Sequence, residues 1–337
     1  MVNLQKEFLE FHNEIRLDDE NDTLRQKRDI LLKKLDRNIP SEAAAYSYFN
    51  QGSYAMGTGI KPENGDYDID VGLKFDIDKN DYPDPIEPKK WVRDAIYGHT
   101  QSVDIRRSCV TVTYKEDGEE AYHVDFAVYA NDNSDGNMYI AKGKEYSDLD
   151  NKYWEISCPQ ELIDKINNKY SDKDDKAQFK RCIRYLKKWK THKFSSDGNG
   201  GPTGIALTIL AYNHFKVKKE YDYVNCKYVY SDFEAFLALV QSITLSTFTL
   251  AYDNENKCNY HKIVLELIVQ PYNNLFEKMT PKQMENFYNK TVEMRDILEN
   301  ASNKSKRNEA CEQLQKLWGE SFPIKYDRSL VGTSESA

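Results

Sequence analysis

Two aspartates separated by a single residue are the part of this chain with the clearest capacity for chemistry. Asp68 and Asp70 lie in residues 65–72, which read GDYDIDVG. This alternation has the period of a β-strand, so both carboxylates are expected on one face, with Ile69 and Val71 on the other. Like charges on a half-buried strand are costly unless a cation or a donor compensates them. A solvated acidic turn is the ordinary interpretation of such a pair, and a bound divalent cation is the simplest compensation.

Two further segments give this pair a chemical context. Asp125 lies in residues 122–129, YHVDFAVY, an apolar strand pattern interrupted by one acid. An unpaired carboxylate is expensive to bury among such neighbours, so Asp125 is expected to face a cation or a cleft. Gly52 and Ser53 follow the strand-like residues 46–51, and they allow backbone N–H groups and a hydroxyl to approach a phosphate. Three acids on two strands, together with Gly-Ser, indicate a metal-dependent nucleotidyl-transfer site.

A neighbouring acid leaves one ambiguity in the choice of the metal ligands. Asp66 shares its strand face with Asp68 and Asp70, so either adjacent pair could hold the ion. We choose Asp68 and Asp70 because aliphatic residues flank them, whereas Asp66 lies beside Gly65 at the loop end. Asp66 remains the alternative.

The order of Gly-Ser, a loop, Asp-x-Asp and a distant third Asp resembles the nucleotidyltransferases of the polymerase-β type. Within them, the chain is most similar to the bacterial cGAS/DncV-like enzymes, the CD-NTases that make cyclic oligonucleotide signals in anti-phage (CBASS) defence. The resemblance implies an α+β fold with a polymerase-β-like core, containing a mixed β-sheet and an N-terminal helix. It also implies a C-terminal helical domain like that of oligoadenylate synthases, and a bilobed shape with the active site in the cleft. The residues that carry it are Gln51-Gly52-Ser53-Tyr54, Asp68-Ile69-Asp70-Val71-Gly72, His123-Val124-Asp125, Arg184-Tyr185-Leu186-Lys187-Lys188-Trp189 and Gly200-Gly201-Pro202-Thr203.

The same resemblance implies a reaction. The protein would make a cyclic di- or trinucleotide second messenger, cGAMP-like, from ATP and GTP, with release of pyrophosphate, and the product would act on a separate effector. Asp68, Asp70 and Asp125 would hold two Mg²⁺ ions, for which Mn²⁺ is expected to substitute. One ion would lower the pKa of the acceptor ribose hydroxyl, and the other would neutralise the leaving pyrophosphate.

Two other functions stay open. A different nucleotidyltransferase of the polymerase-β type would transfer AMP to an RNA, a small molecule or a protein. An inactive nucleotide-binding scaffold would bind NTPs without releasing pyrophosphate.

A second group of candidate phosphate ligands lies in the later part of the chain. Arg184 and Lys187 belong to a basic face of the helix expected over residues 176–192. Such a face is usually only solvated, and the alternative is that these side chains reach the β- and γ-phosphates. Gly200-Gly201-Pro202-Thr203 opens the next expected helix, whose N–H groups and Thr203 hydroxyl could bind the same anion. In related enzymes a Ser stands where this chain has Thr203. The predicted nucleotide-binding residues are Gln51, Gly52, Ser53, Arg184, Lys187 and Thr203.

Composition excludes several other classes of protein. The net charge of −8 over 337 residues argues against stable nucleic-acid binding. Six cysteines without close pairing predict a reducing, cytoplasmic environment. No apolar run approaches the ~20 residues that span a bilayer, so no membrane segment is expected. Cys258-x-x-His261 has a metal-like spacing, but no second Cys or His pair completes a zinc site.

The periodicity of the remaining residues predicts three parts. Residues 1–155 form the nucleotidyltransferase domain, including its N-terminal helical segment, and residues 156–320 form a helical domain. Residues 321–337 form a flexible tail. The resemblance to CD-NTases implies that a ubiquitin-transfer-like partner would conjugate its end at Ala337. Helices are expected at 3–15, 23–37, near Trp91, and at 176–192, 203–219, 231–247, 259–277 and 281–299, and strands at 46–51, 67–75, 109–114 and 121–129.

Overall fold

The computed structural model describes residues 2–17, 21–62, 67–100, 102–116, 119–194 and 200–325. The chain contacts define two compact units. The sheet unit contains the described residues within 16–171 and 266–273, and the helical unit contains those within 1–15, 172–265 and 274–337. The predicted domain boundary at 155/156 differs from this division, because the first 15 residues pack with the helical unit and residues 156–171 with the sheet unit.

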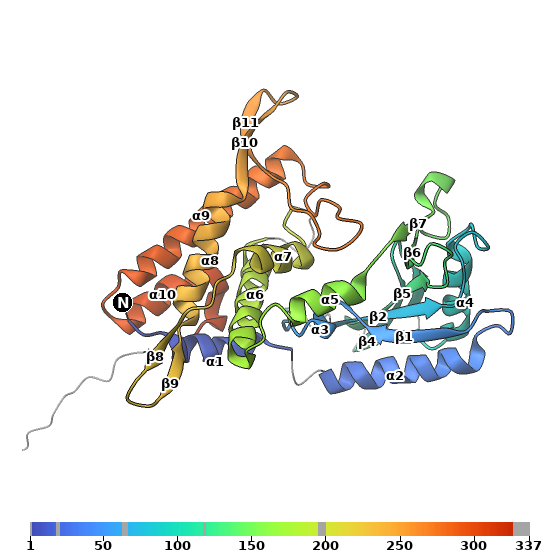
Figure 1. Ribbon diagram of the computed structural model, residues 1–337, viewed down its shortest axis with the longest axis horizontal. Coiled ribbons are helices and arrows are strands. Elements are labelled where there is room, and N and C mark those ends of the chain that lie inside the picture. The colour runs from blue at the N-terminus through green and yellow to red at the C-terminus, as the bar shows by residue number, and fades with distance from the viewer. Residues whose placement is uncertain are drawn as a thin grey trace, which may run out of the picture. The chain divides into compact units, whose positions relative to one another are not determined.

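A mixed β-sheet organises the sheet unit (Figure 1). Its strands are β1 (Tyr46–Asn50), β2 (Tyr67–Phe75), β3 (Ser102–Ile105), β4 (Val110–Glu116), β5 (Glu119–Ala130), β6 (Tyr139–Lys142) and β7 (Tyr153–Ile156). They run in the order β1-β2-β5-β4-β3, with β6 paired to β5 and β7 to β6. β2 and β5 are parallel, and the other pairs are antiparallel. The central strands β2 and β5 are the two that carry the predicted acids.

One face of this sheet is covered by α2 (Asn21–Asn38) and α4 (Ile86–Ile96). Alternate residues of β2, β4 and β5 point into this core, because successive strand residues face opposite sides. The opposite face carries polar side chains near one end and a smaller apolar cluster farther along, formed by Ala127, Tyr129 and Ile140. Two short helices, α3 (Gly52–Ala55) and η1 (Leu149–Asn151), and α5 (Pro159–Asn167) complete the unit. The buried core residues include Leu31, Leu35, Ile69, Val71, Leu73, Val92, Ile96, Val110, Val112, Val124, Phe126 and Val128.

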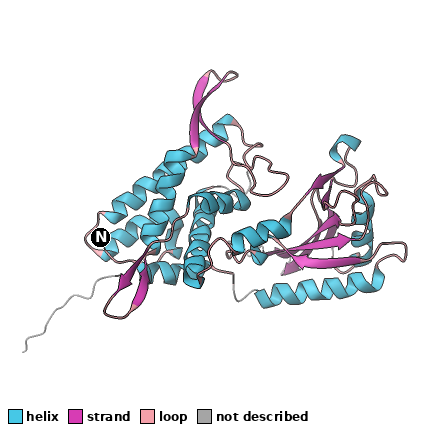
Figure 2. Ribbon diagram, in the orientation of Figure 1, coloured by secondary structure: helices cyan, strands magenta, loops and turns pink. Residues whose placement is uncertain are grey.

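The helical unit combines helices with two β-hairpins (Figure 2). Side chains of Asp172, Thr203, Ser231 and Thr280 accept a backbone N–H at the start of four of the helices, which fixes where each begins. The hairpins are β8–β9 (Lys219–Asp222, Lys227–Tyr230) and β10–β11 (Phe248–Asp253, Cys258–Ile263). The helices are α1 (Gln5–Ile15), α6 (Lys173–Lys193), α7 (Gly204–His214), α8 (Asp232–Ser246), α9 (Pro281–Ser302), α10 (Arg307–Trp318) and the short η2 (Gly319–Ser321).

Aromatic side chains hold α1 in the helical unit. Phe8 and Phe11 of α1 are fully buried. The ring of Phe8 lies edge-on to Tyr185 at 5.3 Å between centroids, and that of Phe11 lies 4.8 Å from Trp318. Such rings bury large apolar areas and gain from edge-on contact, so the N-terminal helix is an integral part of this core.

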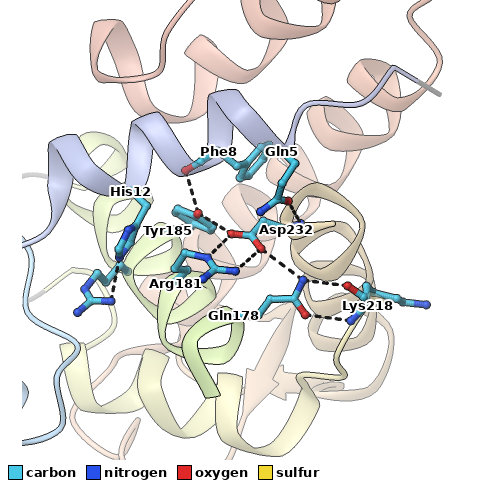
Figure 3. A network of polar contacts seen from close by, with 9 residues as sticks. Gln5, Phe8, His12, Gln178, Arg181, Tyr185, Lys218 and Asp232 are labelled. Atoms are coloured by element: carbon cyan, nitrogen blue, oxygen red, sulfur yellow. Dashed lines mark hydrogen bonds and ion pairs between the residues drawn. The ribbon is translucent and has the colours of Figure 1, made fainter. Parts of the chain in front are cut away.

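A buried aspartate links α1, α6 and α8 (Figure 3). Asp232 is fully buried and accepts from both Nε and Nη2 of Arg181, at 2.5 and 2.8 Å. The hydroxyl of Tyr185 also donates to Asp232, at 2.9 Å, and the backbone N–H of Asp232 donates to Gln5 Oε1 at 2.6 Å. Burial alone would lower the pKa of Arg181, but its hydrogen bonds and ion pair with Asp232 raise it instead. The network therefore neutralises a charge that would otherwise be costly to bury.

Replacing Arg181 by methionine is expected to lower the free energy of unfolding by about 3–5 kcal/mol, because it leaves a buried carboxylate without its cation. Urea denaturation of the purified protein measures this change. The matched control is Arg295→Met, which removes an exposed pair with the adjacent Asp296 and should change stability by less than about 0.5 kcal/mol. Equal losses in the two variants would contradict the special role of the Arg181–Asp232 pair.

The helix predicted at 259–277 is wrong. Residues 258–263 form β11, which pairs with β10, and no helix follows before α9 in the described residues. Asp253 Oδ1 accepts the N–H groups of Glu255 and Asn256, at 3.0 and 3.3 Å, and this local turn closes the hairpin. Pro271 would also interrupt a helix over this range, because it has no N–H to donate. The helix predicted at 203–219 is shorter, since it ends at His214 before β8 begins.

Among the helices described in the structure, none is both long and apolar enough to cross a bilayer.

Candidate functional site

The three predicted acids converge on the polar face of the sheet. Asp68 and Asp70 lie on β2, and Asp125 lies on β5 directly opposite Asp70 in the parallel register. Each carboxylate offers one oxygen, and these three oxygens lie within 4.8 Å of one another. Asp68 is exposed, whereas Asp70 and Asp125 are half-buried. The arrangement follows from the strand period, because Ile69 and Val124 of the same strands point into the opposite, apolar core.

Gly52 brings the chain directly against one of these carboxylates. The N–H of Gln51 donates to the backbone oxygen of Asp70 at 3.0 Å, so the turn after β1 is fastened to β2. Gly52 has a φ of +64°, in the left-handed region. A Cβ placed on Gly52 would lie 1.8 Å from Asp70 Oδ2. Only glycine satisfies both the backbone conformation and the close approach.

The side chain of Gln51 has a partner inside the sheet unit. Its Oε1 accepts the hydroxyl of the buried Tyr129 at 2.8 Å, and this bond ties the turn to β5. The backbone oxygen of Ser53 accepts the N–H of Thr58 at 2.9 Å, which closes the loop around α3. The structure thus gives Gln51 a positioning contact. Nucleotide binding by Gln51, Gly52 and Ser53 stays a prediction.

Gly72, which follows the acidic pair, is required for packing. A Cβ there would lie 2.3 Å from the ring of Phe49, its partner across the β1–β2 pair. The ring of Phe49 therefore packs directly against Gly72, and its centroid is 5.9 Å from that of Tyr129. Phe49 packs against Tyr129 in the small apolar cluster that lies on the same face of the sheet as the acids.

Thr111 is a residue of the site that the sequence analysis missed. It is fully buried on β4, opposite Asp125, and its hydroxyl donates to Asp125 Oδ1 at 2.5 Å. Cys109 Sγ lies 3.4 Å from the same hydroxyl. Burial, followed by the nearby charge of Asp125, raises the pKa of Cys109 to about 12. The alternation Val110-Thr111-Val112 could have placed Thr111 on the acidic face, had the pairing of β4 with β5 been known.

The predicted phosphate-binding residues of the later segment belong to the helical unit. Lys187 on α6 is only 8% exposed, so this part of the helix is not a freely solvated face. Its Cε lies 3.7 Å from a Cβ placed on Gly204, at the start of α7. Thr203 caps that helix by accepting the N–H of Ala206 at 3.2 Å, and its hydroxyl keeps a proton to donate. The side chains of Lys187 and Thr203 therefore both lie at the N-terminus of α7.

Arg184 lies on α6 one turn before Lys187. Its Nη1 lies 3.1 Å from His12 Nε2 of α1. The three acids belong to the sheet unit, and Arg184, Lys187 and Thr203 belong to the helical unit.

Three other sequence predictions have different outcomes. Asp66, the alternative metal ligand, and Ala337, the predicted conjugation point, lie outside the described residues. His261 pairs with Glu285, Nδ1 to Oε2 at 3.0 Å. Among the described residues, the group of acids, histidines and cysteines close enough to share an ion is Asp68, Asp70 and Asp125.

Part of the chain matches known proteins in sequence. Residues 46–129 match the family described as "Cyclic GMP-AMP synthase DncV-like, nucleotidyltransferase domain". A cyclic GMP-AMP synthase of Escherichia albertii is 29% identical over 178 residues, which are 50% of this chain and 37% of that protein. The match therefore spans little more than a third of that relative's length.

Solved structures resemble the chain over nearly its whole length. The Vibrio cholerae DncV cyclic AMP-GMP synthase has a TM-score of 0.69 at 14% identity, with 95% of this chain and 97% of that chain covered. The same enzyme in complex with the linear intermediate pppA(3′,5′)pG has a TM-score of 0.66 at 14% identity, with 97% and 99% covered. The CD-NTase CdnG of Bradyrhizobium diazoefficiens, in complex with GTP, has a TM-score of 0.64 at 11% identity, with 94% and 95% covered. The predicted α+β fold, with a mixed sheet and a C-terminal helical region, is confirmed.

Proposed function

We propose that this chain, which matches the DncV-like nucleotidyltransferase family over residues 46–129, joins NTPs into a cyclic dinucleotide or trinucleotide, cGAMP-like, and releases pyrophosphate. The observation that carries the proposal is the convergence of Asp68, Asp70 and Asp125 within 4.8 Å. Three like charges so close together are unfavourable without a cation, and such an arrangement is more often functional than structural.

The donor set fits divalent magnesium. Carboxylate oxygens are the hard ligands that Mg²⁺ prefers, and Mn²⁺ accepts the same set. Asp68, Asp70 and Asp125 would hold two such ions between them. When bound, the ions lower the pKa of a ribose hydroxyl and neutralise charge on the phosphates.

The chain's own residues orient the reacting groups. The acceptor hydroxyl oxygen would form a bond to the α-phosphorus of an NTP, while the bond from that phosphorus to the β-phosphate oxygen breaks and pyrophosphate leaves. Asp125 would assist removal of the hydroxyl proton. We assign Ser53 and the N–H groups beside Gly52 to the phosphates, and Lys187, Arg184 and Thr203 to the leaving pyrophosphate.

Cyclisation needs a second transfer at the same acids. The complex of Vibrio cholerae DncV with a linear dinucleotide intermediate supports a path in which the first product stays bound, turns and is closed. The structure of that enzyme in complex with ATP and GTP supports these two substrates for the present chain. We extend the proposal to anti-phage signalling in the cytoplasm through a separate effector, and to conjugation of the C-terminus at Ala337.

A product assay tests the reaction. Purified protein with Mg²⁺ and all four labelled NTPs is expected to release pyrophosphate and to form a product that phosphatase does not degrade, because a ring has no terminal phosphate. Excess EDTA should abolish both signals, and added Mn²⁺ should restore them. An AMP adduct on an added RNA, small-molecule or protein acceptor, without a cyclic product, would favour the other transferases. Tight NTP binding without pyrophosphate release would favour the scaffold.

A further inference from the structure

Behind Asp125, on the side of β4, lies a set of hydrogen bonds that none of the nucleotide-binding assignments uses. Thr111 is the nearest member, since its hydroxyl donates to Asp125 Oδ1 at 2.5 Å. Both residues sit on adjacent strands in register, and Thr111 is fully buried. The backbone itself therefore sets the distance between the hydroxyl and the carboxylate.

The direction of these hydrogen bonds follows from counting protons. A threonine hydroxyl has one proton, and an ionised carboxylate can only accept. Since Thr111 gives its proton to Asp125, the 3.4 Å contact with Cys109 must run from the thiol to the Thr111 oxygen. Cys109 thus orients the hydroxyl, and the hydroxyl orients the carboxylate.

A buried lysine stabilises the turn that contains Cys109 through hydrogen bonds to backbone oxygens. Lys89 of α4 is fully buried, and its ammonium donates to the backbone oxygens of Arg106, Arg107 and Gly143 at 3.0, 2.9 and 3.0 Å. The N–H of Arg106 also donates to the oxygen of Cys109 at 2.9 Å. A turn held at so many points has little freedom, so the position of the thiol is fixed by the fold.

We propose that Thr111, oriented by Cys109, is a positioning residue that holds Asp125 in the rotamer needed for metal binding. Its hydrogen bond takes one lone pair of Oδ1, limits rotation of the carboxylate and leaves the remaining lone pairs for the ion. Hydrogen-bond partners of a metal ligand commonly tune metal affinity in this way. The inference rests on the proposed function, in which Asp125 is a metal ligand.

The test measures the Mn²⁺ affinity of variants of the full chain. Electron paramagnetic resonance monitors Mn²⁺ binding directly, in the absence of nucleotide. Thr111→Val keeps the shape and removes the hydroxyl, and it is expected to weaken Mn²⁺ binding about 10-fold. Thr111→Ser keeps the hydroxyl and should stay within about 2-fold of wild type. The matched control is Thr113→Val, a buried threonine of β4 that lies opposite His123 instead of Asp125. It should bind Mn²⁺ like wild type.

Equal Mn²⁺ affinities in Thr111→Val and wild type would overturn the inference, and so would a serine variant as weak as the valine variant. If Thr111→Val does not fold, Cys109→Ala carries the test, with an expected weakening of about 2- to 3-fold that unchanged affinity would contradict. The half-saturating Mg²⁺ concentration for pyrophosphate release should rise in parallel. A wild-type protein that binds Mn²⁺ but releases no pyrophosphate would end the proposed function, while the binding comparison would still decide the role of Thr111.

Discussion

The double variant Asp68→Asn with Asp70→Asn is expected to release pyrophosphate at least about 10³-fold more slowly than the wild type, a loss of roughly 4 kcal/mol of transition-state stabilisation. Asparagine keeps the shape of each side chain but removes the charge that attracts a divalent ion. Two of the three converging carboxylates are lost, so Asp125 alone would remain. Pyrophosphate release at saturating Mg²⁺ and NTP measures the effect.

The same variant separates metal binding from folding. Without added metal it should be at least as stable as the wild type, because two of three mutually repelling charges are gone. The control is Asp104→Asn, an exposed acid on β3 of the same sheet, which should leave the rate unchanged. Product formation by the double variant would show that these carboxylates are not the ligands. If the double variant Asp66→Asn with Asp68→Asn lost activity while the Asp68/Asp70 variant kept it, Asp66 and Asp68 would be the metal ligands instead.

The acidic face could be predicted because its cause is local. A strand places alternate residues on one side, so Asp68 and Asp70 had to share a face whatever the rest of the chain did. Their distance from Asp125 could not be predicted in this way. The direct pairing of Asp70 with Asp125 depends on β2 and β5 being parallel neighbours, although 54 residues separate these two positions in the chain. The resemblance to a known family implied that the three acids share the metal ions, but the parallel pairing itself was not predicted.

Residues whose roles depend on neighbouring strands or helices were missed for the same reason. Thr111 is an ordinary strand residue until β4 pairs with β5. In the sequence, Asp232 is simply a residue at the start of a predicted helix. Nothing nearby in the sequence indicates that Arg181, on another helix, neutralises its charge. The helix predicted at 259–277 is wrong because residues 258–263 form β11 instead. Pairing with β10 decided the outcome there.

Gly52→Ala is expected to lower the rate of pyrophosphate release by about 10²-fold or more, although the change adds only one methyl group. The new Cβ would lie 1.8 Å from Asp70 Oδ2, so either the carboxylate or the turn must move. A displacement of about 1 Å at a reacting group can cost about 10²-fold in rate. The left-handed φ of +64° adds about 1–2 kcal/mol of backbone strain for alanine. Rates and the half-saturating Mg²⁺ concentration should therefore worsen together.

Backbone strain and displacement of the carboxylate can be separated by a second glycine of the same unit. Gly98 also has a left-handed φ, of +72°, but a Cβ there would meet nothing within 4 Å. Gly98→Ala should therefore lose a similar 1–2 kcal/mol of stability, measured by urea denaturation, and keep the wild-type rate. If both variants lost stability equally and both kept the wild-type rate, Gly52 would matter only for the turn. A rate loss confined to Gly52→Ala would place the requirement at the contact with Asp70, where the added methyl group displaces a carboxylate that has to hold the ion.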